Sequence, residues 1–556
     1  MNRTTTSLAE DLAAALPAQS TTTSGSGIPL PAFEGKVRYI HTPPKPCDPL
    51  FSPPPGHEPE RTRLSSHFLV FSVSASHTVG GAVDDLSPYL KHQEEGVLGI
   101  AIEVLVYTTK YLTTLFVSKA DTTGHIPNHP PSRTKAVCGT FIKWLVNQER
   151  HRHPTRKVVI SLFARAQSQY LFPGSAEHSA KHILDDRQLI KWWATVLDPL
   201  LALHNDPSDS VPDVQGYLTI PGYAAQELKT YLPRTTHTHK RFWNPGHPLL
   251  ELAESRGVPP TAPPRSLLPR FPDDPKARFM QDLDDEVGLA EDAPVTFSPS
   301  KRKSGRWDSV SDLARFWEAM EFRQECASGR VVGFLWVVVS PVADSGNGGE
   351  LDGEVGLSQA SSQGLPGGLE RETTPTPSQP SRSPKKRRRK PLTGPIVARQ
   401  PRLKGGSSSL TGTSTELNGM LDSAVRSGEL LLTQEGYDKA MHTLLHLDFA
   451  NLDVAARSTS KWVAEVVGVC GLVEDWGVLV VGMAELGAVG KDSGGVVSVG
   501  NGQGAVNDLG GMVRKKRKVV DEVEVVKPAA VNVLAQHLGI DWHWKERQRA
   551  KDERVE

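Results

Sequence analysis

GVLGIAIEVLVYT, residues Gly96–Thr108, is the stretch that decides the fold. Its almost unbroken run of apolar and β-branched residues predicts a strand covered on both faces. His67–Val73 and Thr113–Ser118 have the same composition on either side of it, and Lys157–Phe163 and Arg330–Val339 repeat it further along the chain. The sequence therefore predicts a central sheet of about five strands.

Apolar residues at helical spacing separate these strands and predict helices that cover the sheet. The predicted helices are Ser7–Leu16, Arg133–Asn147, residues 187–203 behind Asp185 and Asp186, Asp308–Phe322, Gly428–Leu447 and Ala450–Val467. Strands alternating with helices predict the α/β class, with a mixed central sheet and helices on both faces. We expect one large domain with a disordered linker and tails.

Changes in composition set the predicted boundaries. We expect an N-terminal helix and irregular segment at 1–65, the core at 66–341, a disordered linker with a basic cluster at 342–424, C-terminal helices packing on the core at 425–470, and a low-complexity basic tail at 471–556. The linker is rich in Gly and Ser and cannot bury a core of its own. Within the core, residues 204–265 are polar and proline-rich, and they show few periodic features.

Charge and cysteine content exclude several classes of protein. The chain carries 63 Lys and Arg against 63 Asp and Glu, so no global field attracts it to nucleic acid. The four cysteines, Cys47, Cys138, Cys326 and Cys470, lie far apart, which argues against a zinc motif and fits a reducing compartment. We see no signal-peptide pattern and no apolar run near the roughly 20 residues of a membrane span. We expect a soluble intracellular protein without a metal site.

The stretch Arg270–Phe279, RFPDDPKARF, places two adjacent carboxylates between two prolines. Its simplest interpretation is a helix N-terminus, because proline suits the first helical turn and carboxylates suit the positive end of the helix dipole. Adjacent like charges repel, however, so the pair Asp273 and Asp274 also suggests a chemical role.

Three further segments end strands or begin helices, where α/β proteins place ligand sites. They are FVSKADTTG at 116–124, FARAQSQYLF at 163–172 and AKHILDDRQLIKWW at 180–193. Each has a structural explanation when taken alone. Asp121 suits a turn, and Tyr170 and the pair Trp192–Trp193 suit a core.

Taken together and in this order, FVSKADTTG, SQYLFP, AKHIL…KWW and FPDDPKARF resemble the fungal, chaperone-dependent histone H3 lysine acetyltransferases, which share their fold with the metazoan CBP-type enzymes. The resemblance covers residues 66–341 and 428–467. One departure is visible, since the family often has Pro-Ala where this chain has Ala166-Gln167.

The resemblance implies transfer of an acetyl group from acetyl-CoA directly to histone H3, at a core-domain lysine near the DNA entry point and at N-terminal tail lysines, in chromatin assembly and the DNA damage response. The implied coenzyme-binding residues are Ala120, Asp121, Thr122, Arg133, Lys135, Phe163, Gln167, His182, Ile183, Leu184 and Trp192. The implied catalytic residues are Tyr170 and Trp193 along a lysine tunnel, Asp121, and the pair Asp273 and Asp274, with Asp274 as the proton acceptor. Lys276 would be acetylated by the enzyme itself, with Arg278 as a supporting cation.

The implied partners are histones H3–H4, an anti-silencing histone chaperone and a nucleosome-assembly-type histone chaperone, and the implied compartment is the nucleus. The residue chemistry is consistent with this. Aromatic walls desolvate an amine, a nearby carboxylate can take its proton, and no Cys/His or Ser/His pair predicts a covalent intermediate.

Two other classes of function compete. The acidic loop contains fragments of a metal-dependent nuclease motif, but such carboxylates normally sit on separate strands. The basic runs at 385–390, 514–518 and 301–306 suit a non-enzymatic nuclear scaffold, as import signals or nucleic-acid patches. These runs are also compatible with an acetyltransferase.

Overall fold

The computed structural model describes residues 6–16, 33–78, 95–127, 132–201, 214–233, 243–289, 305–323, 330–341 and 427–483. All of them fall in one compact unit that spans residues 1–489. The predicted linker at 342–424, most of the predicted tail and the basic runs at 385–390 and 514–518 lie outside the described residues. Among the described helices, none is long and apolar enough to cross a membrane.

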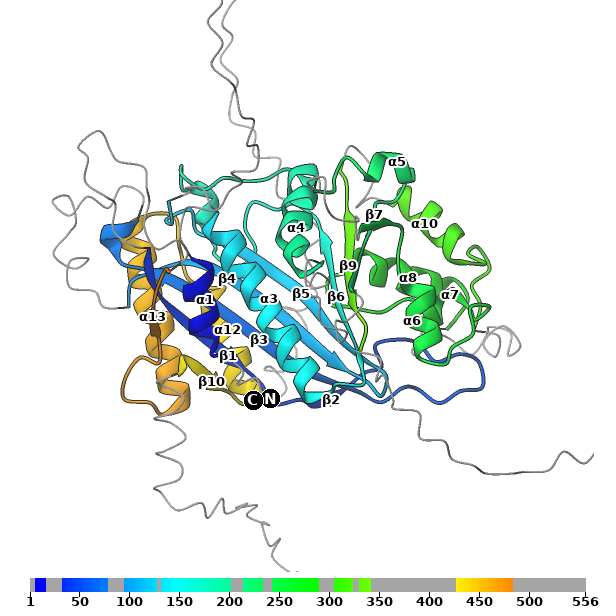
Figure 1. The fold of residues 1–556 in the computed structure, drawn as a ribbon, viewed down its shortest axis with the longest axis horizontal. Helices are drawn as coiled ribbons and strands as arrows, with labels where there is room; N and C mark the ends of the chain where they lie inside the picture. Colours follow the sequence, from blue (N-terminus) through cyan, green and yellow to red (C-terminus); the bar gives the residue numbers. More distant parts are fainter. Residues whose placement is uncertain are drawn as a thin grey trace, which may run out of the picture. The chain divides into compact units, whose positions relative to one another are not determined.

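One mixed sheet of eleven strands organises this unit (Figure 1). Its main path runs β10 (Glu429–Leu431), β1 (Glu34–His41), β3 (Thr62–Val73), β4 (Val97–Thr108), β5 (Leu112–Thr122), β6 (Lys157–Ala164), β9 (Gly333–Val339), β7 (Val214–Thr219) and β8 (Trp243–Pro245). β2 (Lys45–Cys47) pairs with β3, and β11 (Val478–Val481) pairs with β1. The pairs β5–β6, β1–β10 and β7–β8 are parallel and the others antiparallel, which confirms the predicted mixed sheet.

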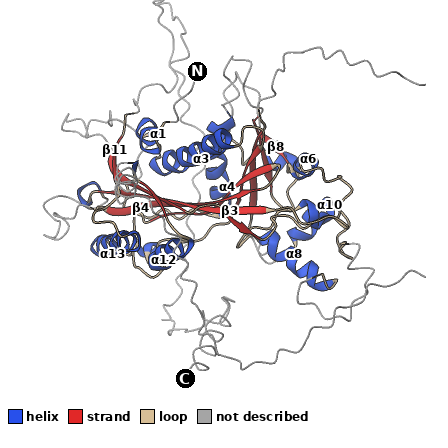
Figure 2. Cartoon of the chain, turned by 90° about the horizontal axis from the view of Figure 1, so that it is seen from below, coloured by secondary structure: helices blue, strands red, loops and turns tan. Residues whose placement is uncertain are grey.

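Helices cover both faces of the sheet, as predicted (Figure 2). On one face lie α1 (Leu8–Ala15), α3 (Arg133–Arg152) and α4 (Asp186–Leu201), and on the other lie α12 (Gln434–Leu444), α13 (Leu452–Cys470) and α8 (Pro275–Glu286). Within the described residues, the remaining helical elements are α5 (Ala225–Leu228), α6 (Leu249–Ser255), α7 (Pro264–Leu267), α10 (Leu313–Glu321), and the single turns Ala75–His77 and Ser175–Glu177.

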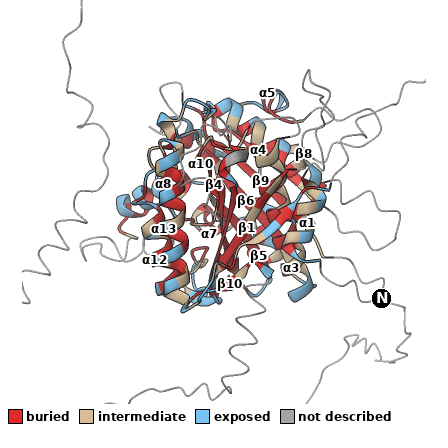
Figure 3. Ribbon diagram, turned by 90° about the vertical axis from the view of Figure 1, so that its left-hand side faces the viewer, coloured by how far each residue is buried: buried red, intermediate tan, exposed pale blue. Residues whose placement is uncertain are grey.

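The apolar strands predicted from composition form the buried centre of the sheet (Figure 3). Every residue of β4 except Thr108 is buried, because side chains from both of its faces enter separate apolar clusters. Ile102 and Val104 pack with the cluster under α3 and α4, whereas Ala101 packs with the cluster under α12 and α13. The predicted helices at the N-terminus and at 133–147 are present as α1 and α3.

Several elements correct the sequence predictions. Residues 18–65 were expected to be irregular and the core to start at 66, but β1 and β2 lie in that range and β3 starts at Thr62. Residues 204–265 contribute β7 and β8 to the sheet, although they are polar and proline-rich. The first residues of the helix predicted at Gly428–Leu447 instead form the short strand β10, and α12 starts only at Gln434. β11 lies within the predicted tail. Short edge strands carry too few apolar residues to be recognised by periodicity.

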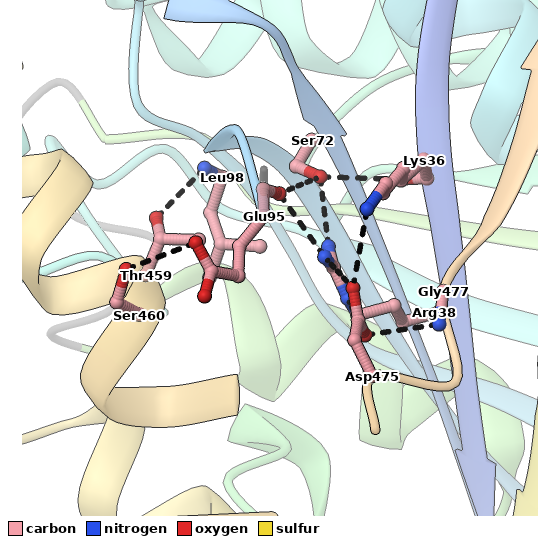
Figure 4. A network of polar contacts seen from close by, with 9 residues as sticks. All are labelled: Lys36, Arg38, Ser72, Glu95, Leu98, Thr459, Ser460, Asp475 and Gly477. Atoms are coloured by element: carbon pink, nitrogen blue, oxygen red, sulfur yellow. Dashed lines mark hydrogen bonds and ion pairs between the residues drawn. The ribbon is translucent and has the colours of Figure 1, made fainter. Parts of the chain in front are cut away.

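A buried ion pair attaches the C-terminal segment 427–483 to the sheet (Figure 4). Arg38 on β1 is 0% exposed, and its guanidinium donates to both carboxylate oxygens of Asp475 at 2.8 and 2.6 Å. The same group donates to Ser72 Oγ at 2.8 Å and to the Glu95 carbonyl at 3.0 Å. Because a buried guanidinium needs a partner for each donor, this network fixes Asp475 and the strand β11 that follows it.

Replacing Arg38 with Met should loosen this attachment. Arg38→Met leaves the carboxylate of Asp475 without its main partner, so the free energy of unfolding should fall by about 3–5 kcal/mol, as for one-sided loss of a buried pair. Lys36→Met is the matched control, because Lys36 is 3.5 Å from the same carboxylate but partly exposed, so its loss should cost about 0–1 kcal/mol. Denaturant unfolding of both variants measures the difference. Equal losses would contradict the role assigned to Arg38.

Candidate active site

A bulge near the end of β5 determines which side chains face each side of the sheet. Glu103 on β4 pairs with Lys119 and Val104 pairs with Val117, so Ser118 is the extra residue on β5. Alternation along the strand is interrupted there, and Ala120 packs with the apolar cluster that contains Val117. Lys119 instead lies beside Glu103, which contacts α12. Bulges of this kind commonly redirect side chains next to active sites.

The carboxylate of Asp121, at the end of β5, holds three segments of the chain together. Its Oδ2 accepts hydrogen bonds from the backbone N–H groups of Tyr170, Leu171 and Phe172 at 2.7, 2.9 and 3.2 Å. Its Oδ1 accepts from the backbone N–H of Thr122 at 2.8 Å and from Lys181 Nζ at 2.9 Å. Asp121 is 8% exposed, and its acceptors are occupied. We therefore assign it a positioning role in the walls of the site and no direct part in proton transfer.

A cavity of about 320 Å³ opens between these segments and the N-termini of α3 and α4. It brings together twelve of the residues predicted from the sequence, from five separate stretches of chain. They are Ala120, Asp121, Thr122, Arg133, Lys135, Gln167, Tyr170, His182, Ile183, Leu184, Trp192 and Trp193. The segment 180–184 and the first turn of α3 thus border the same cavity.

The N-terminus of α3 gives one wall of the cavity a positive character. Ser132 caps the helix, and its side chain accepts from the backbone N–H of Lys135. Arg133 and Lys135 follow in the first turn and line the cavity. Unpaired N–H groups, the helix dipole and two cations together favour an anionic group such as a phosphate. Arg133 is half-buried against the ring of Phe33, at 4.0 Å.

Aromatic side chains make the wall near α4. Trp192 and Trp193 pack edge to face with ring centroids 4.8 Å apart, and Trp193 is 5% exposed. Tyr170 is held by its backbone bond to Asp121, and its hydroxyl donates a hydrogen bond to the carbonyl of Arg165. Burial raises the pKa of Tyr170 to about 12, so the phenol stays protonated at neutral pH. This wall can desolvate an amine.

Lys181 is a cavity residue that the sequence did not single out. Its ammonium is buried, at 2.9 Å from Asp121 and 2.8 Å from Ser175 Oγ. Gly124 packs directly against the backbone of Lys181, because a Cβ at this position, where φ is +85°, would meet that backbone at 2.8 Å. A buried lysine paired with an aspartate 60 residues earlier leaves no local signal in the sequence.

The acidic loop forms the N-terminus of α8, as its simplest interpretation predicted. Asp274 is the N-cap and is 0% exposed, and its Oδ1 accepts from the backbone N–H of Lys276 at 2.9 Å. Asp273 differs sharply from its neighbour. Its side chain is 69% exposed, and it is the one non-glycine residue with positive φ, +57°, in the part of the chain that the structure describes. Such backbone strain clusters at functional sites.

Lys276 is buried beneath this loop as the ion-pair partner of Asp274. Its Nζ lies 2.5 Å from Asp274 Oδ2 and 4.3 Å above the centre of the Phe334 ring. Burial lowers the pKa of Lys276, although the charge of Asp274 opposes that shift. A buried amine with a lowered pKa is a better nucleophile at neutral pH than an exposed lysine.

Five of the residues implied by the resemblance lie outside the cavity lining. Asp273, Asp274 and Lys276 belong to the loop and helix just described. Phe163 stacks on Phe116, at 6.1 Å, and packs with the apolar cluster under α8 and α10. It alternates along β6 with Leu162, which enters the opposite cluster, so its side chain points away from the cavity face. Arg278 lies on α8 within the same helical turn as Lys276.

Several known proteins of one family are similar to this chain. A family model described as the histone acetyltransferase KAT11-type domain matches residues 29–153 and 147–465. Histone acetyltransferase rtt109 of Aspergillus flavus is 36% identical over 470 residues, covering 78% of this chain and 79% of the relative. The protein of that name from Schizosaccharomyces pombe is 32% identical over 252 residues, or 44% and 57% of the two chains. The crystal structure of Rtt109 from Aspergillus fumigatus matches with a TM-score of 0.60 and 32% identity, over 86% of this chain and all of that one.

Acid should weaken the cavity wall at His125, which lies between the lining residues Gly124 and Ile126. Burial, followed by the charge of His178, lowers the pKa of His125 to about 4 from an ordinary 6.5. The unfolded chain therefore binds the proton first, and stability present above pH 6.5 is lost as the pH falls toward 4, by about 3 kcal/mol in all. Denaturant unfolding at several pH values measures this slope. His125→Asn should flatten it, and an unchanged slope would contradict the assignment.

Proposed function

This chain belongs to the family of KAT11-type histone acetyltransferases, and we propose that it binds acetyl-coenzyme A in the 320 Å³ cavity and transfers the acetyl group directly to lysines of histone H3. The resemblance predicted from the motifs is confirmed at the level of family and enzyme class. The observation that carries the proposal is the convergence of twelve separately predicted residues on one cavity.

The cavity fits the coenzyme in its distribution of charge and apolar surface. Arg133 and Lys135 at the N-terminus of α3 would hold phosphates, and residues 182–184 with Trp192 would line the pantetheine path. Gln167 lies on the lining and supports its predicted coenzyme contact. Bound there, acetyl-coenzyme A supplies an activated thioester carbonyl. Phe163 faces away from this space, so we leave it out of the proposed coenzyme site.

Residues of this chain must favour the neutral form of the substrate lysine and accept one proton from it. A free lysine has a pKa near 10.4, so only about one in 2,500 is neutral at pH 7. Desolvation beside Tyr170 and Trp193 favours the neutral form. The neutral amine nitrogen then forms a bond to the acetyl carbon and the carbon–sulfur bond breaks. The nitrogen loses a second proton, which passes to the leaving thiolate and gives the coenzyme thiol. The ammonium proton goes to a carboxylate, for which the pair Asp273 and Asp274 is the proposed acceptor.

The two carboxylates of this pair differ in access. Asp273 is exposed and can be reached by an incoming amine, whereas the buried Asp274 contacts Lys276 with both oxygens. Acetylation of Lys276 would remove the competing ammonium and leave Asp274 with a neutral partner. We propose that Asp273 and Asp274 accept the proton together, with Asp274 available for this role only after Lys276 is acetylated.

Asp274→Asn should stop transfer while leaving coenzyme binding intact. The amide keeps the shape of the side chain but cannot take a proton, so kcat should fall about a hundredfold or more. Steady-state rates and acetyl-coenzyme A affinity provide the measurement. Because the substitution also leaves Lys276 buried without its anion, the double variant Asp274→Asn with Lys276→Met serves as control. Recovery of activity in the double variant would show that Asp274 acts only through Lys276.

Lys276 should be acetylated in active enzyme, and the rate of its own acetylation should rise with pH. Its pKa is lowered by burial, so the neutral amine becomes abundant at a lower pH than for an exposed lysine. Mass spectrometry of protein incubated with acetyl-coenzyme A at several pH values measures the modification. Lys143 on the exposed side of α3 is the comparison lysine. Fully active protein with unmodified Lys276 would contradict the prediction.

The histone and chaperone partners complete the proposal. We propose histones H3–H4 as substrate, an anti-silencing chaperone and a nucleosome-assembly-type chaperone as partners, and the nucleus as compartment, where the basic runs at 385–390 and 514–518 would act as import signals. The proposal of specific H3 lysines as targets, and of a link to DNA damage, rests on the family resemblance.

Incubation of the full chain with labelled acetyl-coenzyme A and H3–H4, with and without each chaperone, tests the function. We expect label on H3, increased by a chaperone and lost in Trp193→Ala. Coenzyme binding without label on any histone would instead favour a non-enzymatic scaffold. Activity that needs a divalent cation and no acetyl-coenzyme A would favour a nuclease.

A further inference from the structure

A line of polar contacts joins the acidic loop to the C-terminal segment. Asp273 Oδ2 lies 3.9 Å from Lys119 Nζ on β5, and that ammonium lies 3.3 Å from Glu103 Oε2 on β4. The other oxygen of Glu103 accepts a hydrogen bond of 2.9 Å from the hydroxyl of Tyr437 on α12. Four side chains from four elements thus connect the loop before α8 to a helix more than 160 residues later in the chain.

The bulge at Ser118 makes this line possible. Without the extra residue, Lys119 would lie on the same face of β5 as Leu115 and Val117, within the apolar cluster under α3 and α4. With it, Lys119 lies beside Glu103, on the face that α12 covers. The ammonium is also 3.3 Å from Ser118 Oγ. The same local irregularity therefore points Ala120 toward the cavity and Lys119 toward the acidic loop.

Glu103 and Tyr437, at the α12 end of this line of contacts, are held in place by burial. The side chain of Glu103 is 9% exposed, so its charge needs both the ammonium of Lys119 and the hydroxyl of Tyr437. Tyr437 is 3% exposed. Burial, followed by the charge of Glu103, raises the pKa of Tyr437 well above its usual value, which keeps the hydroxyl a donor.

At the other end of this line of contacts, the side chain of Asp273 needs a partner to hold it in position. Asp273 is exposed, and its backbone occupies the left-handed region, so packing alone does not fix the side chain. Lys119 is 29% exposed and shares its charge between the buried Glu103 and the exposed Asp273. At 3.9 Å the contact with Asp273 is an ion pair without a hydrogen bond, so the anchored ammonium acts on this carboxylate through its charge.

We propose that Lys119 is a positioning residue for acetyl transfer, which orients Asp273, and that Tyr437 and Glu103 hold Lys119 in place. Through these contacts the C-terminal segment 427–483 helps to position the acidic loop, although the stretch 342–426 separates it from the rest of the core in the sequence. The inference rests on the proposed function in one respect, namely that Asp273 takes part in the transfer.

Steady-state kinetics of the full-length protein with H3–H4 test the role of Lys119. Lys119→Met should lower kcat about tenfold and leave the KM for acetyl-coenzyme A within about twofold, because the coenzyme cavity is not altered. Lys119→Arg should restore most of the lost rate. Lys110→Met is the matched control, since Lys110 is an exposed cation on the turn between β4 and β5, and it should behave as wild type.

A double-variant cycle separates positioning from general structural damage. In an Asp273→Asn background, Lys119→Met should cause no further loss, because the group it orients is already disabled. Tyr437→Phe keeps the ring packing, and it should lower kcat about threefold in wild type but not in Lys119→Met. An equal loss from Lys119→Met in both backgrounds would overturn the inference while leaving the proposed function in place. Full activity of Asp273→Asn would overturn the role of Asp273 and this inference with it.

Discussion

The carboxylate of Asp121 is the interaction on which the site depends. Three consecutive backbone N–H groups, at 170–172, belong to a loop and have no strand to bond to, so a buried anion satisfies them. Burying that anion is unfavourable without compensation, and Lys181 supplies the opposite charge. One side chain thus ties together the end of β5, the loop that carries Tyr170 and the segment 180–184. The relative positions of these walls therefore depend on the register of a single strand.

The C-terminal segment supports the loop that carries Tyr170 from the other face of the sheet. Phe449 packs edge to face on Phe172 at 4.9 Å, and its backbone N–H donates to the carbonyl of Pro173 at 2.8 Å. The loop fixed by Asp121 is therefore supported on its outer side by residues that follow the stretch 342–426. Arg38 secures that support to β1 (Figure 4). The C-terminal segment, most of which the family model also includes, is thus part of the platform for the site.

The central elements were predictable because their physics is local. β4 and β6 are buried on both faces, so their sequences are continuous apolar runs, and Ser7 caps the predicted N-terminal helix α1. β1 was missed because a charged residue at its centre, Arg38, is buried only by virtue of a partner 437 residues away. Twelve residues from the motifs line one cavity. The motifs could not show that Asp121 accepts hydrogen bonds from backbone N–H groups, or that Phe163 points to the opposite face. Both features depend on strand alternation and on partners distant in the sequence.

The outer edge of β1 has a consequence for synthesis of the protein. β10 and β11 occupy that edge end to end, with Glu34 opposite Val481 and Tyr39 opposite Glu429. During translation β1 emerges long before either partner, and at typical elongation rates the interval is roughly 20 to 90 seconds. Throughout that time a nascent chain presents an open strand edge, which is the feature most prone to pairing with other chains. Native assembly therefore requires that the ribosome-bound chain be kept from aggregating until its last described strand has been made.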